Sequence, residues 1–416
     1  MAKTDFSTET SNLRTESTDI ISFSKLLSLV KDVDQTTFLA SRFNPEGEEF
    51  NIEIKKVDIA YKYVKKWTTK FKYHNLELSG NEIKNYFLIS EDENLDAGLK
   101  DMIFVIPEIK IDSSNAFENV KCRAVYSSKD QFYDEIKLCT HINFLKNNGY
   151  NDELKKINDI WSGHKEYEKK KKYKFLKLPN NQWFLRSINS TGFQEYGTAF
   201  TFAFTILLMD EIRKNNDKSN FSIELLTLNE SKISMTISQG TEKELEGLGY
   251  VKSSIVLSNN DLGKGSFKLT KNITLIPKVD DAHSLSIAMP KKSNVNEVSI
   301  GVDHSTLLLT LNDKFSGMHE DFWSIDEFVK DYNTILKLKN PEGVRSAIEQ
   351  KIEASTILQK CNELKNLFRP SQSGVIDNLA KLINLCGKAD NLNIDYDLKS
   401  KLRQIISEVL FTKKNY

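Results

Sequence analysis

The hydrophobic period of the chain changes twice along its length, and this change limits the folds that it can form. Over residues 221–311 apolar and polar residues alternate in short runs, as they do in strands with one buried face. Two of these runs, 221–228 and 231–238, flank Asn229-Glu230 and predict a hairpin with a two-residue loop. From residue 324 onward the apolar spacing is helical. The pattern predicts an α+β protein in which strands and helices are largely segregated.

The same pattern divides the chain into four consecutive segments. Residues 1–18 are rich in Ser and Thr and predict a flexible arm. Residues 19–215 predict a mixed α/β region, residues 216–320 an antiparallel sheet-rich region, and residues 321–416 a helical bundle. Within the second segment, residues 198–214 form a helix that is too apolar to lie on a surface. We therefore expect this helix to be central.

Three finer assignments follow from the local pattern. Residues 19–30 predict a helix capped by Thr18 or Asp19. Residues 131–146 predict one continuous helix closed by Gly149. Residues 306–311 predict the last strand of the sheet-rich region.

Composition restricts the class of partner. Of the 416 residues, 58 are Lys or Arg and 58 are Asp or Glu, so a polyanion would have to bind to a local patch rather than to a basic molecule as a whole. The 4 cysteines are far apart, which favours a reducing compartment. The longest apolar run, 199–209, is too short to span a membrane, and residues 1–18 lack the apolar core of a signal peptide. We expect a cytoplasmic protein without a membrane partner, in the host cell if it is encoded by a virus.

The first candidate site is the basic and aromatic segment 55–73. Lysines that neutralise phosphates and aromatic rings that stack on bases are the combination that sequence-tolerant binding of single strands requires. The alternative is an amphipathic helix with buried aromatic rings and solvated lysines. The residues predicted to contact nucleic acid in this segment are Lys62, Tyr63, Lys65, Lys66, Trp67 and Lys70.

A second basic segment, 165–177, would extend this track. Its candidate phosphate contacts are Lys170, Lys172 and Lys174, and the alternative is a solvated loop. The hypothesis of nucleic-acid binding gains support if the fold brings the two segments together.

Catalytic motifs do not stand out. His283, His304 and His319 lie near carboxylates and suggest a metal-dependent enzyme, but no spacing such as H-E-x-x-H fixes them on one face. Residues 258–266 contain Gly263-Lys264-Gly265 before a strand, whereas a phosphate-binding loop ends in G-K-[ST] and opens a helix. We interpret this segment as a turn, predict no cofactor, and favour a protein that is not an enzyme.

Residues 183–332 resemble a family of phage- and plasmid-borne proteins classed as a domain of unknown function. The resemblance rests on Trp183-Phe184-Leu185-Arg186, the strand pair at 221–238, the glycine turn at 258–266, and Phe322-Trp323 before a helix. It implies a protein encoded by a virus or mobile element, often beside genes of DNA metabolism, with no established activity.

The sequence as a whole predicts a non-enzymatic protein that binds single-stranded DNA or RNA and self-associates. One alternative is a virion or scaffold protein that acts through protein–protein contacts, which the neutral net charge favours. The other is the metal-dependent enzyme with His283, His304 and His319.

Overall fold

The computed structural model divides into two units, which we describe separately. The six-stranded unit comprises residues 1–7, 66–195 and 260–265, and the seven-stranded unit comprises residues 8–65, 196–259 and 266–416. Neither unit is continuous, whereas the sequence pattern divided the chain into consecutive segments. The structure describes residues 6, 8–11, 13, 18–87, 99–110, 117–215, 220–263, 265–288, 299–316, 324–326, 328–329, 332 and 340–411.

The seven-stranded unit is built on one sheet. Its strands follow the order β1-β10-β11-β12-β13-β14, with β15 also paired to β13. Leu228 pairs with Ile233, and the N–H of Asn229 donates to the Lys232 carbonyl at 2.9 Å, which confirms the predicted hairpin. The strands are β1 (Glu9–Ser11), β10 (Phe221–Leu228), β11 (Lys232–Leu245), β12 (Gly249–Asn260), β13 (Phe267–Pro277), β14 (Leu285–Ala288) and β15 (Ser299–Val302).

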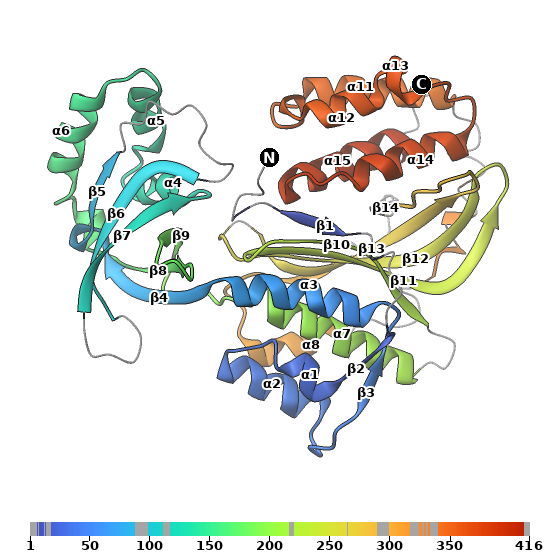
Figure 1. The fold of residues 1–416 in the computed structure, drawn as a ribbon, viewed down its shortest axis with the longest axis horizontal. Coiled ribbons are helices and arrows are strands. Elements are labelled where there is room, and N and C mark those ends of the chain that lie inside the picture. Colours follow the sequence, from blue (N-terminus) through green and yellow to red (C-terminus); the bar gives the residue numbers. More distant parts are fainter. Residues whose placement is uncertain are drawn as a thin grey trace. The chain divides into compact units, whose positions relative to one another are not determined.

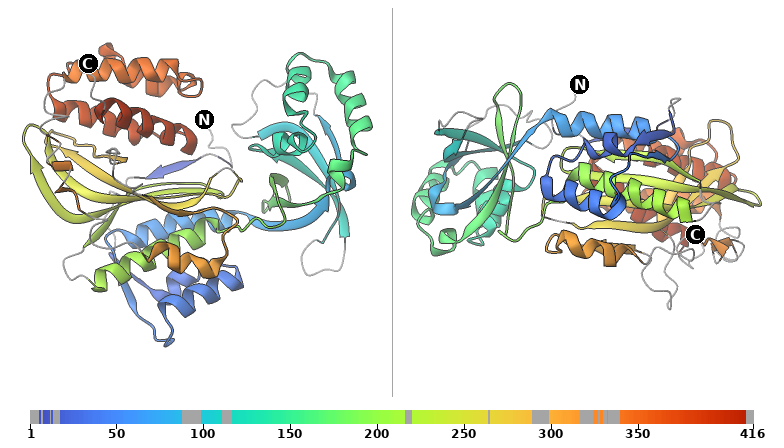
Figure 2. Two further views of the ribbon diagram at one scale, coloured as in Figure 1. Left: turned by 180° about the vertical axis from the view of Figure 1, so that it is seen from behind. Right: turned by 90° about the horizontal axis from the view of Figure 1, so that it is seen from below.

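Helices cover both faces of this sheet (Figures 1 and 2). The C-terminal helices lie over one face: α11 (Pro341–Ala354), α12 (Asn362–Phe368), α13 (Pro370–Ser373), α14 (Leu379–Asp390) and α15 (Tyr396–Phe411). The opposite side holds α1 (Phe23–Leu27), α2 (Val33–Phe43), α7 (Gly197–Asn215), α8 (Leu311–Phe315) and the small sheet of β2 (Ile20–Ser22) and β3 (Asn51–Glu53). The sheet is therefore the central layer of its unit.

Helix α7 is buried along most of its length, as its apolar composition predicted. Phe200 and Phe204 are at most 1% exposed and stack with ring centroids 5.9 Å apart. The hydroxyls of Thr201 and Thr205 donate to the carbonyls of Gly197 and Thr201, at 2.8 and 2.7 Å. Because these bonds satisfy the polar groups inside the helix, it can be buried without an unpaired hydroxyl at either threonine.

The six-stranded unit has its helices on one face of a curved sheet. The strand order is β4-β8-β9-β7-β6-β5, and β9 runs parallel to β7 while the other pairs are antiparallel. Its strands are β4 (Lys72–Ser79), β5 (Lys84–Phe87), β6 (Leu99–Lys110), β7 (Phe117–Val125), β8 (Lys170–Lys177) and β9 (Trp183–Asn189). Its helices are α4 (Ser128–Asp134), α5 (Cys139–Asn147) and α6 (Asn151–Trp161), with short 3₁₀ turns at Gly80–Glu82 and Lys165–Glu168.

Three sequence predictions are wrong in detail. The helix predicted over 131–146 is broken between α4 and α5, where Lys137 adopts a positive φ of 57° that ends the first helix. The strand predicted over 306–311 is a 3₁₀ turn, Leu308–Thr310, that leads into α8. The helix predicted over 19–30 begins later, at α1, where Ser22 rather than Thr18 or Asp19 is the N-cap.

Part of the predicted N-terminal arm is ordered. Residues Glu9–Ser11 form strand β1, which pairs with Leu226–Leu228 at the edge of the large sheet. Backbone hydrogen bonds between strands need no apolar side chains. The polar composition of this segment therefore gave no sign of a strand in the sequence.

The α+β class is confirmed, with helices at 44% and strands at 30% of the chain. Among the residues that the structure describes, no helix combines the length and the hydrophobicity required to cross a bilayer.

We predict that Gly387→Ala destabilises the seven-stranded unit by about 1–3 kcal/mol, because a Cβ at this position in α14 would lie 2.2 Å from the His283 carbonyl oxygen. Urea unfolding of the full chain measures the change. Gly192→Ala is the control, because a Cβ there meets no atom within 4 Å. Equal stability of the two variants would contradict the close packing of α14 on this loop.

Candidate nucleic-acid interface

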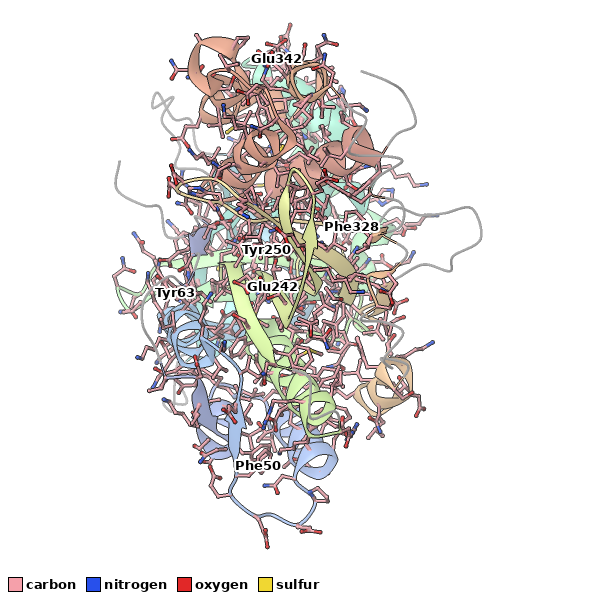
Figure 3. The ribbon with its side chains drawn as sticks, turned by 90° about the vertical axis from the view of Figure 1, so that its right-hand side faces the viewer. Phe50, Tyr63, Glu242, Tyr250, Phe328 and Glu342 are labelled. Carbon is pink, nitrogen blue, oxygen red and sulfur yellow. The ribbon has the colours of Figure 1, made fainter. Side chains whose placement is uncertain are left out.

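The first basic segment forms helix α3 (Val57–Lys70), which links the two units of the chain. Its apolar stripe is buried, with Val57, Val64 and Trp67 each at most 4% exposed. Lys62, Lys65 and Lys66 are exposed, whereas Tyr63 and Lys70 are half-buried. Figure 3 shows Tyr63 on the outer side of the helix. Helix α3 is therefore the amphipathic helix of the alternative interpretation, and its Lys62, Lys65 and Lys66 side chains face solvent.

A single carboxylate holds the start of this helix. Asp58 accepts hydrogen bonds from Lys25 at 2.8 Å and from Lys62 at 2.7 Å. The hydrogen bond from Lys25, followed by that from Lys62, lowers the pKa of Asp58 below its usual value. The Lys62 side chain is still 68% exposed, so this ion pair contributes little stability and competes only weakly with a phosphate.

The second basic segment is strand β8 and not the solvated loop that the sequence allowed. It pairs with β4, the strand that follows α3, and Lys72 lies opposite Lys177 while Ser79 lies opposite Lys170. The two basic segments are thus adjacent through backbone pairing. However, Lys170 lies opposite Ser79, seven residues along β4 from the first residue of that strand, Lys72, which is about 23 Å. The pairing joins the segments without gathering their lysines into one cluster.

Two of the predicted contact residues are buried. Trp67 is 4% exposed and Lys174 is 1% exposed, so neither side chain is accessible to a polynucleotide in this structure. Trp67 is buried because it completes the apolar stripe of α3, and Lys174 because it joins an internal ion-pair network. We therefore remove both from the candidate site.

The internal network is built around Glu195. One carboxylate oxygen accepts from Arg186, and the other lies 3.0 Å from Lys174 Nζ. The Lys174 ammonium also lies 4.0 Å from the centre of the Phe193 ring. Burial by itself raises the pKa of Glu195, but the charges of Arg186 and Lys174 outweigh it and hold that pKa below its usual value. Glu195 is therefore ionised, and together with Asp261, whose charge also acts on both groups, it balances the two buried cations.

Strand alternation determines which side chains reach the other face of the six-stranded sheet. Val120, Cys122 and Ala124 of β7 and Tyr173 and Phe175 of β8 point into the core beneath α4–α6. The residues between them must point to the opposite face, which we call the open face because no helix of this unit covers it among the described residues.

The open face is rich in cations. In addition to Lys170 and Lys172, it carries Lys121 and Arg123 from β7. Lys84 of β5 also belongs to it, because Lys84 and Lys121 both pair with Val105, a β6 residue outside the core. Sequence reasoning missed these three, although the alternation of buried and charged residues over 120–124 was a usable signal.

Aromatic side chains occupy the middle of the open face. Arg123 pairs with Phe184, Phe184 pairs with Leu176, and Leu176 pairs with Tyr73, so these residues form one row across four strands. Phe6 packs edge-on against Phe184 with centroids 4.8 Å apart. The Tyr73 side chain is 36% exposed, and the Arg186 guanidinium lies 5.4 Å from its ring centre. Tyr73 is the ring of this row that solvent reaches.

The glycine segment 258–266 is a turn between β12 and β13, as predicted. The Leu262 carbonyl accepts from Gln131 Nε2 at 2.9 Å. Gly263 has a positive φ of 84°, and a Cβ there would lie 2.3 Å from Asn189 Nδ2. The absence of a side chain at Gly263 therefore allows the turn to approach Asn189 of the same unit closely. Lys264 lies outside the described residues.

The histidines are not gathered into a metal site. His283 Nδ1 lies 2.8 Å from the Asp281 carbonyl, and His304 is 6% exposed and packs against Tyr196 with centroids 5.5 Å apart. Among the side chains that the structure describes, no group of three or more His, Cys, Asp or Glu residues could hold a metal ion. His319 lies outside the described residues.

No protein-family model matches the chain, and comparisons with curated proteins and with solved structures find no match. The resemblance to the phage- and plasmid-borne family therefore stays a prediction from the residues that carry it.

We predict that Glu195→Gln lowers the free energy of unfolding of the six-stranded unit by about 3–5 kcal/mol, because it leaves two buried cations, Arg186 and Lys174, with the single negative charge of Asp261. Denaturant unfolding measures the loss. Glu166→Gln, which breaks the exposed pair with Lys169, is the control and should leave stability unchanged. A Glu195→Gln protein as stable as the control would show that the Glu195 carboxylate does not stabilise the two buried cations.

Proposed function

We propose that the chain binds single-stranded nucleic acid on the open face of its six-stranded sheet. The observation that carries the proposal is that five cations from three strands lie on this one face, with Lys84, Lys121 and Arg123 toward the Trp183 end of β9 and Lys170 and Lys172 toward its Asn189 end. These cations would neutralise phosphates, and each neutralised phosphate releases counterions. The site differs from the surface that the sequence suggested, which was centred on α3.

Local charge supports this proposal although the whole chain is neutral. Glu77, opposite Lys172 in the strand register, is an exposed acid on the same face. Glu82 is a second exposed acid among the described side chains, and its charge interacts with Lys170. The five cations outnumber these two acids, so the field near them is positive at close range, where screening at physiological salt is incomplete. The buried pair of Lys174 and Arg186 adds little to this field because the charges of Glu195 and Asp261 balance it.

Tyr73 supplies the aromatic component of the site. Tyr73 is 36% exposed and lies in the row that links β4 to β7 through Phe184. Base stacking on an aromatic ring is worth about 1–3 kcal/mol and tolerates any base. A sheet face with one accessible ring and cations on neighbouring strands therefore suits a single strand better than a duplex, whose bases are already stacked.

We predict that the double variant Lys121→Gln/Lys170→Gln weakens binding of a fluorescein-labelled oligo(dT) and lowers the slope of log K against log salt by about 2, because two phosphate contacts are lost. Fluorescence anisotropy at several salt concentrations measures both quantities. Lys381→Gln is the matched control, because this exposed lysine lies on α14 of the other unit.

An unchanged slope in Lys121→Gln/Lys170→Gln would rule out the open face. If Lys65→Gln/Lys66→Gln lowered the slope instead, the exposed lysines of α3 would be the site. Light scattering with and without the oligonucleotide addresses the scaffold alternative: assembly that ignores nucleic acid, together with no binding, would favour it.

We predict that Tyr73→Ala weakens oligo(dT) binding by about 1–3 kcal/mol, whereas Tyr73→Phe retains most of the affinity because it keeps the ring. The anisotropy titration distinguishes the two variants at one salt concentration. Equal losses in both would indicate that the Tyr73 hydroxyl, and not stacking, contributes to binding.

A further inference from the structure

The seven-stranded unit contains a polar cavity of about 260 Å³. Its lining includes Lys56, at the start of α3, and Glu224, Lys252, Thr274 and Ser286 from four strands of the sheet. Asp390, at the end of α14, also lines it. Pockets for drug-sized ligands begin at about 300 Å³, so this cavity suits a smaller molecule.

Each of the four charged groups in the lining has a counter-charge within the protein. Lys56 Nζ lies 3.2 Å from Glu224, and Lys252 Nζ lies 2.8 Å from Glu242 of β11, which is labelled in Figure 3. Asp390 accepts two hydrogen bonds from Arg403, at 2.7 and 3.0 Å. A charged ligand would have to compete with these pairs, and the balanced lining offers it no net attraction.

Glu224 is held as an acceptor. Burial raises its pKa, but the charge of Lys56 and the hydrogen bonds from Ser238 and Lys56 outweigh burial, so that the pKa lies below its usual value. Ser238 Oγ donates to one carboxylate oxygen at 2.5 Å, and Lys56 Nζ approaches the other. Glu224 is therefore ionised at neutral pH and fixed in position.

Three hydroxyl groups at the cavity form a hydrogen-bonded chain in which the donor of each bond can be assigned. Thr274 Oγ1 donates to Ser254 Oγ at 2.9 Å and lies 2.7 Å from Ser286 Oγ. A hydroxyl carries one proton, so Ser286 must donate to Thr274, since Thr274 has already given its own proton to Ser254. The Ser286 oxygen then presents only lone pairs to the cavity. A ligand at this position must donate a hydrogen bond.

Donors complete the lining. An ammonium group has three N–H bonds, and the carboxylate partners of Lys56 and Lys252 do not use all of them. The cavity thus offers acceptors at Ser286 and Glu224 and donors at the two lysines. An anion without an O–H or N–H group could satisfy only the donors, and a cation without lone pairs only the acceptors. A hydroxyl group both donates and accepts, so a molecule with several hydroxyls satisfies both sets.

We propose that this cavity binds a small, neutral, polyhydroxylated molecule of monosaccharide size. The site is separate from the open face, and neither proposal depends on the other.

Isothermal titration calorimetry of the full chain with D-glucose and with myo-inositol tests the proposal. We expect at least one of the two to bind saturably, and neither inorganic phosphate nor glycine to displace it. Ser286→Ala, which removes the acceptor, should raise Kd about tenfold, equivalent to about 1.4 kcal/mol. Ser284→Ala, at a half-buried lining position, should raise it less and is available if Ser286→Ala does not fold.

Ser41→Ala is the control, because this exposed serine of α2 bonds the Phe38 carbonyl away from the cavity. Saturable binding that Ser286→Ala or Ser284→Ala weakens and Ser41→Ala does not would support the proposal. No saturation by either polyol, displacement by phosphate or glycine, or equal affinity in the cavity variants and the control would overturn it.

Discussion

The two-residue alternation of β-strands is the constraint on which the candidate interface depends. In the six-stranded sheet, Cys122 and Phe175 point toward α4–α6, because they belong to the hydrophobic core that the sheet forms with these helices. Their neighbours Arg123 and Lys174 then have to face the opposite side. A slip of one residue in any strand would bury the lysines and expose the core. The cationic character of the open face thus follows from the packing of the other face.

Burial of charge separates the structural lysines from those that a ligand can reach. Lys174 occupies the same face as Lys170 and Lys172, yet it ends beside Glu195 and Phe193 and is 1% exposed. A bulge between β8 and β9, near Lys174, brings Arg186 into the same network. Once two cations share one buried carboxylate, each depends on the others, so the network favours a fixed local structure over ligand exchange.

The two units differ in how far their charged side chains are balanced by opposite charges. On the open face, cations from several strands outnumber their exposed acidic neighbours, which suits a polyanion. In the cavity of the seven-stranded unit, the charged side chains are paired one to one, and oriented hydroxyls provide the remaining hydrogen-bonding groups. A chain with equal totals of acidic and basic residues can therefore contain one surface with a net positive charge and one cavity without a net charge.

The sequence by itself determined the α+β class, the hairpin at 221–238 and the buried helix α7. These features arise from local periodicity and turn chemistry, which act between residues close together in the chain. For the basic segment 55–73 the sequence allowed an amphipathic helix with buried aromatic rings as an alternative, but periodicity did not decide between helix and strand.

Only the tertiary structure decided that β8 pairs with β4 and that Lys84, Lys121 and Arg123 join Lys170 on one face. The register between distant strands is set by which side chains fill the shared core, and that choice depends on all the strands and helices together. No local pattern contains this information, so the sequence located the basic segments while the fold decided which of their lysines share a face.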